Sequence, residues 1–204
     1  MKLRRLIPAV VALVVLAGCG GSKTFTGSQL SRILPAKADA PPGLSLIAGS
    51  SGDQPLDLVA RDDTEKSRLQ RDGFENAFAS FYANSGALDL LQNAGKADPS
   101  AHLVAALGIT FKTAAGAKDA LAALHQRDLG HGTHVSTIPV QKIGDESIAE
   151  KGTQEGSPLP GYLIYWRDGN AIFGVTAAGG PTAGVTLSEA TNVAEAMERR
   201  AQNV

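Results

Sequence analysis

The chain has a single cysteine, Cys19, and few aromatic residues: one Trp, three Tyr and six Phe among 204 residues. With one cysteine no disulfide can form within the chain, so the folded state must rest on packing and hydrogen bonds. The longest apolar run spans residues 6–16, which is shorter than the about 20 residues that a membrane-spanning helix needs. The net charge is −1 and no basic block is present, which excludes a typical nucleic-acid-binding surface.

The first nineteen residues have the form of an export signal. A basic start with Lys2, Arg4 and Arg5 precedes the apolar run, and small residues follow it. The tetrapeptide Leu-Ala-Gly-Cys at residues 16–19 resembles the lipobox of bacterial lipoproteins at all four positions. That resemblance implies that the Cys19 thiol receives a diacylglyceryl group and that the peptide is cut before Cys19. The alternative is an ordinary secretory signal with a cysteine there by chance.

The remaining chain divides into a short tether and one domain. Removal of residues 1–18 leaves 16 Lys and Arg against 20 Asp and Glu, a net charge near −4. Residues 19–27 hold the lipidated cysteine and a small, polar stretch that we expect to be a flexible tether. Residues 28–204 suffice for a single globular domain with its own core. Because two or more acyl chains anchor stably, the sequence predicts a protein held on the extracytoplasmic face of the cell membrane.

The first half of the domain gives weak secondary-structure signals. The expected elements are a short helix with Ser28 as N-cap that ends before Pro35, a strand at 44–48, a polar segment at 49–73 with a helical turn at 65–71, and a loop with a short turn of helix at 84–100. The aromatic residues between these segments fit either a helix face or a strand: Phe74, Phe78, Phe81 and Tyr82.

The second half is more regular. Alternating apolar residues predict a strand at 103–111, and a change to helical spacing predicts a helix from 114, with Thr113 as N-cap. The further expected elements are an extended edge segment at 134–143, a turn at 144–146 and a strand at 147–151. A capping box from Thr186 to Glu189 begins a final helix with a narrow alanine-lined stripe that is suited to close packing on a sheet.

The strongest tertiary signal is a hairpin over residues 162–176. Two strand-like runs flank Asp168-Gly169-Asn170, a tight-turn sequence. With Asp168-Gly169 as the loop, Gly174 would lie opposite Leu163, and with Gly169-Asn170 it would lie opposite Tyr165. We favour the second register, because a glycine leaves room for the tyrosine ring.

Together these elements predict an α+β fold in which helices pack on an antiparallel sheet. The stretches LPAKADAPPGL, GDESIA and YLIYWRDGNAIFGV and the last helix resemble the extracytoplasmic sensor-type domains and small lipoproteins of actinobacteria and their relatives. The resemblance covers most of the mature chain. It implies binding or sensing at the cell surface, and it supplies no catalytic residue.

Two histidine patterns suggest catalysis but lack the necessary partners. The sequence GHGTHV at 130–135 resembles the histidine motif of subtilisin-like proteases, but the Asp and Ser motifs of that site are absent. His131 and His134 could chelate zinc, with His125 and His102 nearby. No third ligand or acidic partner has an evident place, and glycines around His131 favour a loop. We therefore expect exposed loop histidines and neither a metal nor a cofactor.

The aromatic hairpin is the candidate ligand-binding region, through Tyr162, Tyr165, Trp166 and Arg167. Strand alternation places Tyr162 and Trp166 on one face of the sheet and Tyr165 and Arg167 on the other. At least one face must be core, and the other could be core under a helix or could line a pocket. The adjacent acids at 145 and 146 are expected to face solvent.

The sequence thus predicts a membrane-anchored bacterial lipoprotein with a non-catalytic, sensor-like domain that binds a small molecule or a protein. One alternative is a metal-dependent hydrolase that uses His131 and His134. Another is a structural adaptor of an envelope complex. A large apolar pocket would favour the first of these three, a tightly held metal the second, and an exposed apolar patch without a pocket the third.

Overall fold

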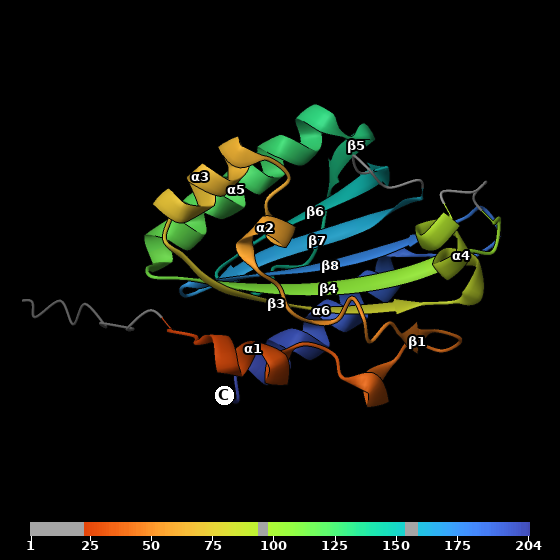
Figure 1. The fold of residues 1–204 in the computed structure, drawn as a ribbon, viewed down its shortest axis with the longest axis horizontal. Coiled ribbons are helices and arrows are strands. Elements are labelled where there is room, and N and C mark those ends of the chain that lie inside the picture. The colour runs from red at the N-terminus through yellow and green to blue at the C-terminus, as the bar shows by residue number, and fades with distance from the viewer. Residues whose placement is uncertain (1–22, 94–97, 154–158) are drawn as a thin grey trace, which may run out of the picture.

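The fold is an eight-stranded antiparallel sheet with helices on both faces (Figure 1). The computed structural model describes residues 23–93, 98–153 and 159–204, so the signal segment and Cys19 lie outside the described residues. The strands are β1 (Ser45–Leu46), β2 (Gly52–Asp53), β3 (Phe74–Ala83), β4 (His102–Phe111), β5 (Thr133–Ile138), β6 (Glu146–Thr153), β7 (Pro160–Asp168) and β8 (Ala171–Gly179). Their order is β1-β3-β4-β8-β7-β6-β5, and β2 also pairs with β3. The predicted α+β class is confirmed.

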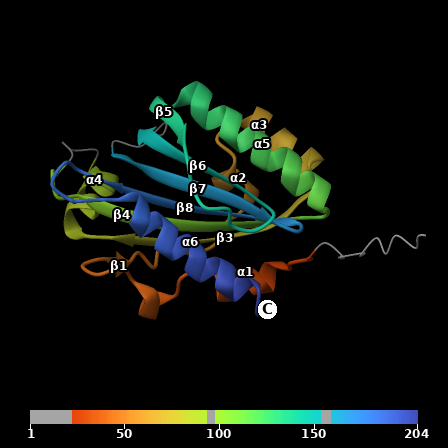
Figure 2. The same cartoon turned by 180° about the vertical axis from the view of Figure 1, so that it is seen from behind.

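The helices form two outer layers. They are α1 (Gly27–Ile33), the 3-10 turn η1 (Lys37–Asp39), α2 (Leu56–Val59), α3 (Asp63–Arg71), α4 (Ser85–Asn93), α5 (Ala114–His131) and α6 (Leu187–Ala201). Figure 2 shows α6 lying across one face of the sheet, with α1 beside it. Helices α3 and α5 lie over the opposite face (Figure 1). In the part of the chain that the structure describes, no helix is long and apolar enough to span a membrane.

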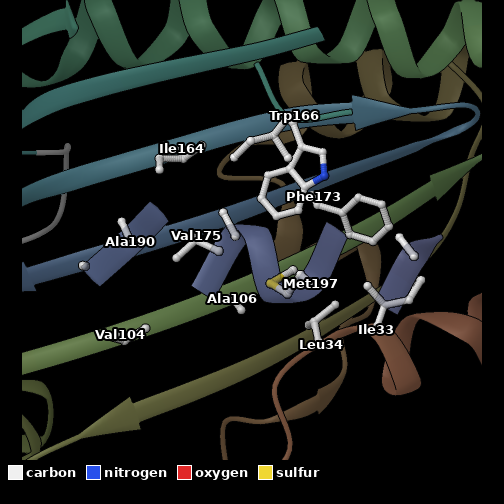
Figure 3. Close-up of a cluster of buried hydrophobic side chains, with 14 of the residues drawn as sticks. Ile33, Leu34, Val104, Ala106, Ile164, Trp166, Phe173, Val175, Ala190 and Met197 are labelled. Carbon is white, nitrogen blue, oxygen red and sulfur yellow. The ribbon is translucent and has the colours of Figure 1, made fainter. Parts of the chain in front are cut away.

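The face under α1 and α6 holds the largest buried cluster (Figure 3). Trp166 is fully buried there, and its ring stacks on Phe173 with the ring centroids 5.4 Å apart. The predicted alanine stripe of α6 is confirmed, since Ala190, Ala194 and Met197 are all buried. Small side chains let this helix lie close to the sheet, and they leave space for the two large rings.

The predicted hairpin is present in the favoured register. Strands β7 and β8 are joined by Gly169-Asn170, and Tyr165 lies opposite Gly174. A side-chain carbon added to Gly174 would lie 2.9 Å from two carbons of the Tyr165 ring. The ring therefore occupies the room that the glycine leaves.

Several local predictions need correction. The first helix begins after Thr26 rather than Ser28, because the Gln29 side chain accepts the Thr26 N–H at 2.8 Å, the pairing typical of a capping box. The ambiguous aromatic segment is strand β3. The helix from Ala114 continues through Gly130 and His131, so the expected loop at His131 is wrong. One glycine costs a helix only about 1 kcal/mol, and the last turn is closed by the Gly132 N–H, which donates to the Asp128 carbonyl.

The tether prediction also changes at its C-terminal end. Phe25 is 3% exposed and lies edge-on to Phe173, with the ring centroids 5.6 Å apart. Residues 23–27 therefore pack on the domain instead of continuing the tether. A single apolar residue among small polar ones gave no periodic signal from which this could be predicted.

Candidate functional site

One region of the sheet is left partly uncovered by helices. On the face under α5, that helix and α3 cover one end of the strands, and α4 lies at the other end. Between α2 and α4 the strands β4 and β8 are open to view in Figure 1. The side chains of Phe81, Ala105, Leu107 and Thr176 are accordingly only half-buried there.

This region contains a cavity of about 220 Å³. We call it the sheet groove, and its side chains come from α2, the segment before it and four strands: Gln54, Leu58, Val59, Ala79, Phe81, Ala105, Leu107, Leu163, Tyr165, Gly174 and Thr176. Leu58 is 71% exposed at the rim. The walls are mainly apolar, with the Gln54 amide and the Thr176 hydroxyl as polar groups.

Strand register explains why a hollow forms here. One row across the strands reads Phe81, Ala105, Thr176, Leu163, and the next row reads Ala79, Leu107, Gly174, Tyr165. On the two central strands three of the four positions are small, namely Ala105, Thr176 and Gly174. They form the floor between the larger side chains Phe81, Leu163 and Tyr165 of the flanking strands. A smaller hollow of about 20 Å³ borders the groove, and it shares Leu163 and Thr176 with it.

Tyr165 connects the groove to a buried charged network. Its hydroxyl donates to the Asp128 carboxylate at 3.2 Å, and Asp128 also accepts from Arg127 Nε at 2.8 Å. Arg127 reaches Glu65 of α3 through Nη1 at 2.8 Å. Burial, followed by the charge of Asp128, raises the pKa of Tyr165 above its ordinary value. The network therefore fixes α3, α5 and the Tyr165 ring relative to one another, and the phenol stays neutral at physiological pH.

A second buried acid lies beside the smaller hollow. Glu150 is 2% exposed, and its Oε1 lies 2.5 Å from His125 Nδ1. Burial is the largest influence on Glu150 and raises its pKa, against the hydrogen bond from His125. Its Oε2 makes no hydrogen bond to the described residues. The pair ties α5 to β6 on the same side of the sheet as the groove.

The four residues predicted from the hairpin are placed differently from one another. Tyr165 lines the sheet groove, and Tyr162 borders the smaller hollow with the Lys151 ammonium 5.7 Å from its ring centroid. Trp166 is in the core, and its indole N–H donates to Glu198 at 3.0 Å. Arg167 holds the hairpin end by donating to Asp145 and to the Gly169 carbonyl. Of the four, only Tyr165 lines the larger cavity.

The histidines do not gather into a metal site in the described structure. His131 ends α5, whereas His134 is in β5 with a φ of 55°. His125 pairs with Glu150, and His102 lies 2.9 Å from Glu189. Within residues 23–93, 98–153 and 159–204, no group of three or more His, Cys, Asp or Glu side chains is placed to hold a metal ion.

Comparison with known proteins gives a likeness of fold. No family model matches the chain, and no curated protein matches it. The fold is similar to the extracellular domain of PknH from Mycobacterium tuberculosis, with a TM-score of 0.54 at 15% sequence identity. The likeness covers 90% of this chain and 100% of that domain. At 15% identity this likeness shows a similar fold alone.

The sequence did not predict the groove itself. Its α2 wall lies in a segment that was expected to be polar, and the sequence signal there is short: Pro55 followed by Leu56, Leu58 and Val59. A proline before such residues favours a helix start. Local sequence does not show whether a helix covers a given part of a sheet, because that depends on packing between distant segments. Only the tertiary structure shows that this part of the sheet is uncovered.

Proposed function

We propose that this protein is a membrane-anchored, non-catalytic, extracytoplasmic domain that binds a small apolar ligand in the sheet groove. The observation that carries the proposal is the cavity of about 220 Å³ with largely apolar walls and two polar groups. Ligand sites are typically concave and mostly apolar, with few polar groups that fix orientation. A rim residue as exposed as Leu58 costs solvation free energy in the empty state, which a bound ligand would recover.

Two further observations support the extracytoplasmic part of the proposal. The lipobox-like sequence at residues 16–19 precedes the domain closely. The fold neighbour is the extracellular domain of a bacterial protein.

Ligand binding is tested with the chain from residue 19 onward, carrying Cys19→Ser, purified without detergent. Native mass spectrometry detects a retained ligand, and titration with dansyl-undecanoic acid measures binding of an apolar probe. Ala105→Phe should fill the floor of the groove and weaken probe binding at least tenfold. Ala122→Phe, at an exposed site on α5, is the matched control and should bind like the parent.

Equal binding by both variants would place the probe elsewhere, and no binding by the parent would overturn the small-ligand proposal. Crosslinking of the groove to an envelope protein in that case would support the adaptor alternative.

The anchor is tested separately. Full-length protein should incorporate labelled palmitate and sediment with membranes, and Cys19→Ser should abolish the labelling.

A further inference from the structure

Asn170 joins the start of the domain to the β7–β8 turn. Its side-chain oxygen accepts the Phe25 N–H at 2.6 Å, and its amide nitrogen donates to the carbonyls of Phe25 at 3.1 Å and Phe111 at 2.6 Å. Asn170 is 4% exposed. One buried amide thus satisfies three backbone groups of two other segments, which makes the attachment costly to break.

Lys23 strengthens the same attachment. Its carbonyl accepts the Asn170 N–H at 3.2 Å, and its ammonium lies 2.8 Å from Asp168. Gly169 has a φ of 56°, and a side-chain carbon there would lie 1.8 Å from the Lys23 carbonyl oxygen. The turn therefore requires glycine both for its conformation and for this contact. We call these five residues the Asn170 clamp: Lys23, Phe25, Asp168, Gly169 and Asn170.

The clamp limits how far the domain can move from its anchor. Four residue steps separate Cys19 from Lys23, and an extended chain spans at most about 3.6 Å per step, or about 14 Å in all. Strand β8 runs from the clamp through Ala171–Gly179, a length of about 30 Å at about 3.4 Å per residue. The tether is thus at most about half as long as the sheet.

We infer that the β7–β8 turn is the membrane-facing end of this protein and that its partner surface is the phospholipid headgroup layer. The sheet then points away from the bilayer, with the segment after Gly179 about 30 Å farther out than the turn. This inference rests on the lipid anchor of the proposed function. It requires no ligand in the sheet groove.

The surface charge favours an orientation in which the strands point away from the bilayer over one in which a helix-covered side of the sheet lies flat on it. The helices on the two sides expose residues of both signs, such as Asp63 and Arg71 on α3 and Glu195 and Arg199 on α6. Charges are also mixed in the hollow next to the clamp, where Lys23, Lys142 and Arg199 face four acids: Asp145, Asp168, Glu195 and Glu198. Neither side should adhere strongly to anionic lipid, so the tether and clamp set the orientation.

The test uses full-length lipidated protein in phosphatidylcholine–phosphatidylglycerol vesicles. Because the only native cysteine is the lipidated one, a new cysteine is the single free thiol. Lys112→Cys places a nitroxide beside the clamp, where Phe111 bonds to Asn170. Thr182→Cys places one beyond the far end of β8, also at an exposed site. Relaxation of each label by a nickel-chelating lipid reports its proximity to the headgroups.

We expect relaxation at least threefold greater at position 112 than at position 182, and similar in 50 and 500 mM salt. Asn170→Ala should reduce the difference. If that variant unfolds, a 20-residue Gly-Ser insertion after Gly21 lengthens the tether by about 25 Å and should do the same without touching the clamp. Equal relaxation at the two positions, or greater relaxation at 182, would overturn the orientation. Protein that is unlabelled by lipid and absent from membranes would overturn the anchor instead.

Discussion

Replacement of Gly174 by alanine tests the packing that forms the floor of the sheet groove. The added carbon would lie 2.9 Å from both Cδ1 and Cε1 of Tyr165. The ring cannot withdraw freely, because its hydroxyl is held by Asp128 and the side chain is 7% exposed. Overpacking of this kind costs about 1–3 kcal/mol. Gly174→Ala should therefore lower the free energy of unfolding by about that amount.

Urea unfolding followed by Trp166 fluorescence is the direct assay, because this buried residue is the only tryptophan. With urea m-values of about 2–3 kcal/mol per molar for a domain of this size, the midpoint should fall by roughly 0.3–1.5 M. Gly130→Ala is the control. It is on α5 with nothing within 4 Å of the new carbon, and it should be neutral or stabilise by up to about 1 kcal/mol.

A double-mutant cycle assigns the cost to the tyrosine ring. In a Tyr165→Leu background the Gly174→Ala change should be less costly, with a coupling energy of about 1 kcal/mol or more. A neutral Gly174→Ala variant, or a cost that is the same in both backgrounds, would refute the cross-strand contact. It would also remove the physical reason for the predicted hairpin register.

Two other stability predictions concern the buried rings. Trp166→Ala should lower the free energy of unfolding by about 3–5 kcal/mol, as measured by far-UV circular dichroism. Trp166→Phe should cost less, because a ring remains against Phe173. An unchanged melting temperature for the alanine variant would contradict the placement of Trp166 in the core. Burial raises the pKa of Tyr82 to about 12, and burial also raises the pKa of Tyr165. The unfolded state therefore loses these protons first, and stability should fall above pH 10 by up to about 1.4 kcal/mol per pH unit for each tyrosine. Tyr165→Phe should reduce this slope, and an unchanged slope would count against a neutral, buried phenol at Tyr165.

The parts of the fold that sequence predicted best are those with strong local patterns. The β4 strand, the β7–β8 hairpin with its register, and the alanine stripe of α6 follow from alternation, turn chemistry and helical spacing. The segment from Phe74 was ambiguous because its aromatic spacing fits both periods. It became strand β3 because it pairs along its length with β4, a contact between residues about 30 apart.

The candidate site was harder to predict for a different physical reason. Tyr165 was identified, but it was grouped with Trp166 and Arg167, which support the core and the hairpin end. Aromatic residues provide large burial free energy wherever they pack, so sequence cannot separate a pocket wall from a core contact. That distinction depends on which parts of the sheet the helices cover.

The groove and the Asn170 clamp are close along one strand. Gly174 follows Ala171 by three residues on β8, so the floor of the groove begins about 10 Å from the turn. If the turn faces the headgroups, the Tyr165 side of the groove is its membrane-proximal side, within about 25 Å of Cys19 when the tether is fully extended. An apolar ligand of low solubility would then have only a short path from the bilayer to the groove. Insertion of a long Gly-Ser segment after Gly21 should slow uptake of such a ligand from vesicles, and it should leave uptake from solution unchanged.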